Sequence, residues 1–309
     1  MKRSKICDLL GIQYPIILGG MGGISDASLA AAVSNAGGLG TIASLTYSKE
    51  AIREEIDKAR GLTTNPFAIN VALFRPDASD IINAIIEKGV KIAITAAGSP
   101  RKFTETLKKA QMKVMHVVAS VEMAKKAEEA GVDVVIAEGT ESGGVASREE
   151  VATLPLIPQV IDSVKIPVIA AGGFGDARGY LAARALGAQG VQMGTVFLAT
   201  KECTRISDTY KQMLLSATES STAIVARKAF PMRMLKNRAY QLIEEADRAG
   251  KSPQEILTII SEFQKRQDNP EEGAFVCGQV AGLIKEIKSV QQVIHEIVEG
   301  AEAIYKSLA

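Results

Sequence analysis

The sequence has 309 residues, of which 47% are apolar, 23% are charged and 5% are aromatic. This composition is typical of a folded globular protein and excludes a disordered or collagen-like chain. The 36 Lys and Arg residues nearly balance 35 Asp and Glu residues, and no basic run stands out, so we do not expect nucleic acid as a partner. The length fits one large α/β barrel or two ordinary domains.

Cysteines and apolar runs indicate the compartment. Cys7, Cys203 and Cys277 lie far apart and form no CxxC pair, so the sequence predicts neither a disulfide framework nor a metal site. The first 15 residues contain no apolar stretch long enough for an export signal, and no run of 18 apolar residues occurs anywhere. We therefore expect a cytoplasmic protein that does not span a membrane.

Short runs of β-branched and apolar residues alternate with longer segments of helical period along the first 200 residues. The runs predict strands at residues 15–18, 39–43, 67–72, 91–95, 113–117, 132–137, 167–170 and 190–193. The segments between them predict helices at 25–35, 49–60, 78–88, 101–110, 121–130 and 176–186. Eight such units predict an α/β fold, a closed (β/α)8 TIM barrel, with an open doubly wound sheet as the alternative.

The alternation stops at residue 202 and does not return before residue 273. Residues 202–273 carry charged, Met- and Arg-bearing segments without a clear strand, which predicts a helical lid subdomain inserted after the eighth strand. Residues 1–201 and 274–309 then form the barrel. Methionines of the lid either line an apolar pocket or form the core of the subdomain. Its basic side chains are candidates to meet phosphates of a substrate or nucleotide, and they are Arg227, Lys228, Arg233, Lys236 and Arg238.

Glycine-rich turns follow several strands, at the end of a barrel where active sites lie. Gly172-Gly173 follows the seventh strand, and Gly194-Thr195 follows the eighth. Glycine lets backbone N–H groups approach a phosphate closely, and these two strand ends commonly hold phosphates in barrels. The Gly19–Gly23 turn after the first strand has room for a flat ring beside its backbone. We therefore expect a phosphate-bearing ligand at this end of the barrel.

Three ionisable residues are candidate catalytic groups. Glu138 and Glu141 lie on the Gly-rich loop after the sixth strand, where they act as general acid or base or are simply solvated. His116 lies near the end of the fifth strand and points either into the site or into the core, because alternation along a strand leaves its direction open. No Ser-His-Asp order or HExxH spacing occurs, so the sequence does not indicate a hydrolase or a metalloenzyme.

Five ordered motifs carry a family resemblance: Gly19-Gly20-Met21, Ile69-Asn70-Val71, the stretch from Glu138 to Gly144, Ala170-Ala171-Gly172-Gly173, and Val191-Gln192-Met193-Gly194-Thr195. Together they resemble the nitronate monooxygenase family, formerly the 2-nitropropane dioxygenases, which includes flavin-dependent enoyl-acyl-carrier-protein reductases. The order of the motifs and the stretch 278–283 look closer to the reductases.

The resemblance implies a barrel that binds FMN. Its phosphate would lie at Gly172, Gly173, Gly194 and Thr195, and its ring beside Gly20, Met21 and Gly22 with polar contacts from Asn70 and Gln192. The remaining positions expected at the cofactor are Ser44, Glu138, Gly143 and Gly144. No dinucleotide turn of the form GxGxxG follows a strand, which favours FMN over FAD.

One position departs from the family pattern. Members usually carry a His after the second Gly of the strand-six loop, where this chain has Val145. Valine cannot take a proton, so the resemblance favours an FMN-dependent oxidoreductase that takes hydride from NADH or NADPH and reduces an activated alkene such as an enoyl thioester. The alternatives are a nitronate monooxygenase with His116 as base, and a flavin-binding or electron-delivery protein without turnover. The expected partner is a small-molecule or acyl-thioester substrate, and a homodimer stays open.

Overall fold

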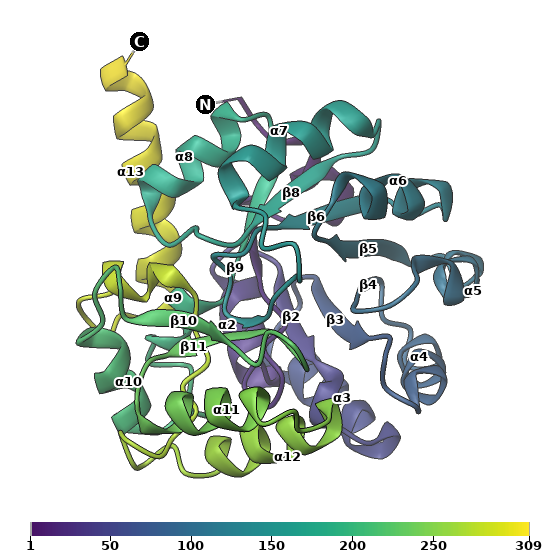
Figure 1. The fold of residues 1–309 in the computed structure, drawn as a ribbon. Helices are drawn as coiled ribbons and strands as arrows, with labels where there is room; N and C mark the ends of the chain where they lie inside the picture. Colours follow the sequence, from purple (N-terminus) through teal and green to yellow (C-terminus); the bar gives the residue numbers. More distant parts are fainter. Residues whose placement is uncertain (1, 309) are drawn as a thin grey trace.

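The computed structural model describes residues 2–308 and contains eight parallel strands that form one sheet (Figure 1). Each expected strand is confirmed to within two residues at either end. Their bounds are β1 Ile16–Leu18, β2 Gly40–Ala43, β3 Phe67–Ala72, β4 Ile92–Ala96, β5 Lys113–Val118, β6 Val134–Glu138, β8 Val168–Ala171 and β9 Gly190–Met193.

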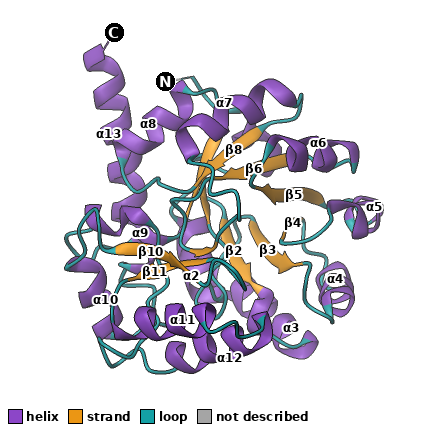
Figure 2. Ribbon diagram, in the orientation of Figure 1, coloured by secondary structure: helices purple, strands orange, loops and turns teal. Residues whose placement is uncertain are grey.

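The sheet closes on itself. The order β1-β9-β8-β6-β5-β4-β3-β2 leaves β1 and β2 at the two ends, and a parallel bridge between Ile17 and Leu39 joins them. Leu18 N donates to Leu39 O over 2.9 Å, and Leu39 N donates to Ile16 O over 2.9 Å. The barrel is therefore confirmed and the open doubly wound sheet is not, and Figure 2 shows the strands ringed by helices.

Helices cover the outside of the barrel and one closes its N-terminal end. The outer ring consists of α2 Ala27–Asn35, α3 Lys49–Leu62, α4 Ala78–Glu87, α5 Thr104–Lys109, α6 Val121–Glu129, α7 Thr153–Ser163, α8 Ala177–Ala185 and α13 Val290–Leu308, the last packed against α8 and α2. Helix α1, Lys5–Leu10, buries Ile6 and Leu10 with the side chains that fill the barrel. Neither α1 nor α7 was expected, because α1 is short and α7 contains Pro155 and Pro158.

The insertion after β9 contains strands as well as helices. Helix α9, Thr195–Leu198, precedes it, and the segment itself forms α10 Asp208–Leu215, β10 Thr222–Val225, β11 Met232–Leu235, α11 Arg238–Arg248 and α12 Pro253–Gln264. Strand β11 pairs with β10 and also with β7, Gly144–Val145, of the strand-six loop. The expectation of a segment without strands is therefore wrong.

The sequence of β11 explains that error. Met-Arg-Met-Leu has no β-branched residue, and neighbours on both edges hold it in the sheet. Met232 and Met234 lie buried in a core shared with α11 and α12, so they pack the subdomain rather than line a pocket. No helix within residues 2–308 is long and apolar enough to cross a membrane.

Candidate functional site

Three polar side chains point toward the inside of the barrel at the C-terminal ends of its strands. Val134 and Ile136 belong to the inner core, so Glu138, two residues further along β6, shares their face. Asn70 alternates with outward residues of β3, and Gln192 alternates with outward Val191 and Met193 of β9. The strands β3, β6 and β9 thus bring an amide, a carboxyl and a second amide to one end of the barrel.

Three polar atoms buried at this end have no hydrogen-bond partner. They are Oε1 of Gln192, Oγ of Ser44, the residue that follows β2, and Oγ1 of Thr140 on the loop after β6. A buried polar atom without a partner costs free energy, and a bound ligand can supply the missing hydrogen bond. Buried polar atoms that need a partner are compatible in their chemistry with the polar edge of a flavin ring, which needs hydrogen bonds.

The turns after β8 and β9 are packed backbone against backbone. Gly172 has φ +86°, and a Cβ built there would lie 2.6 Å from Gly139 O. Gly173 has φ +81°, a region that side chains disfavour. Thr195 Oγ1 accepts from Gly278 N over 2.8 Å, which attaches the turn after β9 to the segment that returns from the insertion. These turns leave backbone close to any ligand above them, as a phosphate site requires.

The Gly19–Gly23 turn lies against Asn70 of β3 and Leu45 of the turn after β2. A Cβ at Gly20 would lie 2.5 Å from Asn70 Cγ, and one at Gly22 would lie 2.8 Å from Leu45 Cδ2. The Met21 side chain approaches Gly194, whose added Cβ would stand 3.3 Å from the Met21 sulfur. The structure therefore brings together the ends of β1, β3 and β9, which carry residues expected to bind the ring.

A buried arginine holds this arrangement and was not singled out from the sequence. Arg75 donates to Ser44 O, to Tyr47 O over 2.8 Å, and through Nε to Asp77 Oδ1 over 2.6 Å. It therefore fastens the loop after β3 to the turn that carries Ser44. The sequence signal for this arrangement is an Arg that lies just beyond a strand, two residues before an Asp.

Glu138 is the ionisable side chain at this end with a strongly shifted pKa. Burial raises the pKa of Glu138 to about 7, and the hydroxyl of Ser142 opposes this shift. Near neutral pH the carboxyl is therefore partly protonated, as a group that gives up and regains a proton must be.

Glu141 has a structural role instead. Both of its carboxylate oxygens accept from Thr153 N, at 3.0 and 2.9 Å, and Thr153 Oγ1 donates to Oε2 over 2.7 Å. The carboxylate thus lies at the N-terminus of α7, where the helix dipole favours a negative charge. Glu141 therefore holds the strand-six loop against the start of α7.

His116 points out of the barrel. Its neighbours Met115 and Val117 face the inner core, so His116 shares the opposite face with Val114 and Val118. Its Nδ1 lies 2.7 Å from Thr95 Oγ1, and burial lowers the pKa of the imidazole to about 4. These contacts favour His116 as a core histidine. They do not favour its use as a base inside the barrel.

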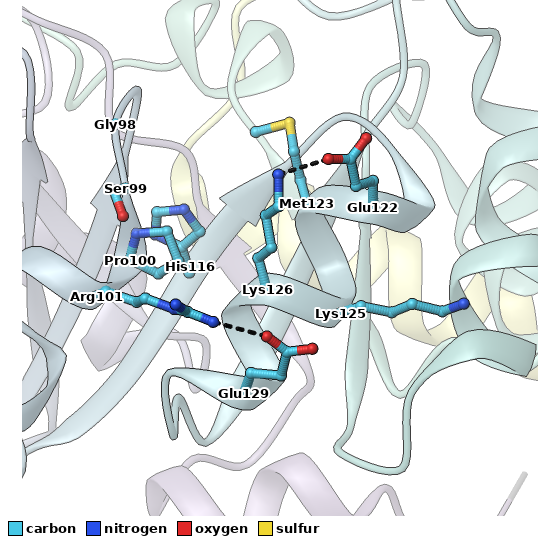
Figure 3. Close-up of a pocket in the computed structure, with 10 residues that line it drawn as sticks. All are labelled: Gly98, Ser99, Pro100, Arg101, His116, Glu122, Met123, Lys125, Lys126 and Glu129. Carbon is cyan, nitrogen blue, oxygen red and sulfur yellow. Dashed lines mark hydrogen bonds and ion pairs between the residues drawn. The ribbon is translucent and has the colours of Figure 1, made fainter.

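Beside His116 lies a hollow of about 610 Å³ between α6 and the loop that follows β4 (Figure 3). Four of its charged side chains form two pairs, Arg101 with Glu129 over 2.8 Å and Lys126 with Glu122. This hollow faces the helical layer, so it is separate from the residues that converge inside the barrel.

The strand-six loop joins the insertion to the barrel. Gly143 packs on Cys277 and Gly278, and Gly144 pairs with Arg233 of β11. The Arg233 side chain is buried and donates to Thr140 O over 2.9 Å, so it braces this loop. Val145 is 46% exposed at the edge of the small sheet.

Comparisons with known proteins show the family. The family model described as "Nitronate monooxygenase" matches residues 3–300. A 5-hydroxy-7a-methyl-1-oxo-octahydro-1H-indene-4-carboxyl-CoA dehydrogenase of Mycobacterium tuberculosis is 37% identical over 80% of this chain and 70% of its own. A probable nitronate monooxygenase of Staphylococcus aureus is 33% identical over 79% of this chain and 80% of its own.

Two solved structures have the same fold throughout. FabK from Thermotoga maritima is 40% identical with a TM-score of 0.95, over 100% of this chain and 99% of its own. A nitroalkane oxidase from Streptomyces ansochromogenes is 27% identical with a TM-score of 0.87, over 98% of this chain and 99% of its own. The chain therefore belongs to the nitronate monooxygenase family and is an enzyme, a flavin-dependent oxidoreductase.

Proposed function

We propose that the protein binds FMN at the C-terminal end of its barrel, takes hydride from NADH or NADPH and reduces an activated alkene such as an enoyl thioester. The observation that carries this proposal is the buried Oε1 of Gln192, which has no hydrogen-bond partner and lies on β9 two residues before the partly exposed glycine turn at Gly194. The 40% identity with FabK over the whole chain supports the reductase branch of the family.

The residues present fit FMN in their chemistry. Gly172, Gly173, Gly194 and Thr195 would hold the phosphate, and Asn70, Gln192 and Ser44 would contact the polar edge of the ring. Gly143 packs tightly on the backbone of Cys277 and Gly278, and Gly144 has φ +84°, so their part is to shape the loop above the ring. When bound, FMN supplies transfer of a hydride from a nicotinamide nucleotide to an electrophilic carbon.

The protein's own part includes a proton. Reduction of an alkene adds a hydride to one carbon and a proton to the other, so a proton donor must lie near the reacting atoms. The Glu138 carboxyl, with its pKa raised to about 7, is our candidate to hold this proton on a carboxyl oxygen. We expect turnover to decrease as the pH rises above about 7, because the protonated form is then lost.

Anaerobic titration tests the proposal. The purified protein is loaded with FMN, and NADH, NADPH or an alkyl nitronate is added while the flavin absorbance is followed. Bleaching by a reduced nucleotide, followed by recovery of colour with an enoyl thioester, is the expected result. Bleaching by nitronate alone would identify a nitronate monooxygenase, and a flavin that responds to none of them would identify a binding protein.

The identity of the cofactor has its own test. Heat-released cofactor is separated by chromatography, and recovery of FAD would contradict the proposed single-phosphate site. Gly194→Val adds a branched side chain whose nearest neighbour is the flexible Met21, so the fold should tolerate it. Its FMN dissociation constant should rise at least about tenfold, and an unchanged value would show that the phosphate lies elsewhere.

A further inference from the structure

Two aromatic rings meet where the insertion approaches the barrel. Phe74 lies two residues after the end of β3, and Phe230 lies in the turn between β10 and β11. Their centroids are 6.5 Å apart with an interplanar angle of 68°, an edge-to-face contact. Phe74 nevertheless remains 52% exposed, so this contact leaves much of the ring open to a further apolar group.

The same end of the barrel carries more exposed apolar surface. Leu45, in the turn after β2, is 40% exposed and lies against Gly22 of the first turn. Val145, on the loop after β6, is 46% exposed, and the next residue donates from Ala146 N to Pro231 O over 2.9 Å beside Phe230. Grouped exposed apolar side chains mark contact sites, and this group adjoins the residues proposed to bind FMN.

Hydrogen bonds hold the segment that carries each ring. Phe74 precedes Arg75, which is buried and holds its loop through Ser44, Tyr47 and Asp77. The turn of Phe230 is held on two sides. Arg148 donates to Lys228 O over 3.1 Å and Ala229 O over 3.2 Å, and the buried Asp247 accepts from Lys228 N over 3.1 Å and from Ala229 N over 3.0 Å. Both rings therefore lie on segments that the surrounding structure holds in place.

We propose that Phe74 and Phe230 determine substrate specificity, because the hydrocarbon part of the substrate packs between or against their rings. The proposal rests on the proposed function only for the identity of the substrate. The paired rings and their apolar neighbours select a substrate with an extended apolar group over a small polar one. Polar contacts from Asn70, Glu138 and Gln192 would lie at the opposite, reacting end.

The test measures binding and turnover as a function of chain length in the FMN-loaded protein. Binding is followed from the flavin spectrum with saturated acyl thioesters from butanoyl to decanoyl, and turnover with the matching enoyl thioesters. Each methylene buried against the rings should raise affinity by up to about fourfold. Phe74→Ala and Phe230→Ala should each reduce this gain to about twofold or less, while the FMN dissociation constant stays within about twofold.

Leu62→Ala provides a matched control. Leu62 is also an exposed apolar residue, at 48%, but it ends α3 at the opposite end of the barrel, so its loss should leave the chain-length series unchanged. A series that is flat in the wild type, or equally steep in both Phe variants, would overturn the proposal. Binding that rises with chain length without any turnover would retain this inference and reject the proposed reaction, so the two failures are distinguishable.

Discussion

Gly172 and Phe74 lie at the same end of the barrel in opposite kinds of surroundings. At Gly172 an added Cβ would stand 2.6 Å from a backbone oxygen of Gly139, whereas Phe74 leaves half its surface exposed and touches Phe230 across a gap in the sequence of more than a hundred residues. Backbone packing defines the first region, so its shape changes only if the fold changes. Side chains define the second, so substitutions can alter it while the barrel persists. The comparison indicates how a barrel of this kind can retain its proposed cofactor site while substitutions in the second region change which substrate it accepts.

The largest expected effect comes from breaking the backbone packing. Gly172→Ala should destabilise the protein by about 4 kcal/mol, because the methyl group meets the backbone at a left-handed φ. Gly131→Ala is the matched control, since Gly131 has φ +85° with nothing within 4 Å, and should cost about 1 kcal/mol. Urea unfolding measures both, and equal losses would show that the contact with Gly139 is unimportant.

Glu138, at the same end of the barrel, makes the stability of the protein depend on pH. Its pKa is about 7 in the folded protein and near 4.5 when unfolded, so the carboxyl contributes stability below pH 4.5 that is lost as the pH rises through 7. Glu138→Gln removes this loss. Between pH 4.5 and 8, the free energy of unfolding of the variant should therefore rise by up to about 3 kcal/mol relative to that of the wild type. Urea unfolding of the flavin-free proteins gives this difference. A difference that does not change with pH would place the pKa of Glu138 in its ordinary range.

Arg75 connects the two regions, because it positions Ser44 in one and supports Phe74 in the other. Arg75→Lys keeps the charge but loses the planar group that donates to two carbonyls and Asp77, so FMN affinity should fall about tenfold. Arg101→Lys is the control, an exposed Arg that pairs with Glu129 at the hollow beside α6 rather than with residues of the proposed ring site. Equal FMN dissociation constants for Arg75→Lys, the control and the wild type would contradict this positioning role.

The smallest expected effect is a gain of activity. Val145→His restores an ionisable side chain at the position where the family resemblance expects the base, and the exposed site tolerates the change. Nitronate oxidation should increase several-fold over a low wild-type rate, which oxygen consumption with an alkyl nitronate measures. A wild type that already oxidises nitronates rapidly, with no increase in the variant, would show that Val145 is not the missing position.

The sequence by itself determined the barrel and the ends of its strands. Runs such as residues 67–72 and 190–193 are buried on both faces and bounded by turns, so local composition specifies them. The glycines that follow β8 and β9 were equally visible, because positive φ and close approach favour Gly at those positions. These features depend on neighbours in the sequence.

Tertiary structure decided which way side chains point and what they touch. Met-Arg-Met-Leu became a strand because β10 and β7 supply hydrogen bonds on both its edges. His116 faces out of the barrel. The carboxylate of Glu141 accepts a hydrogen bond from Thr153 of α7, a helix that the sequence pattern did not predict because it contains two prolines. Contacts between segments far apart in the chain, such as those of Arg75 with Ser44 and of Phe74 with Phe230, follow from closure of the barrel and leave no periodic signal in the sequence.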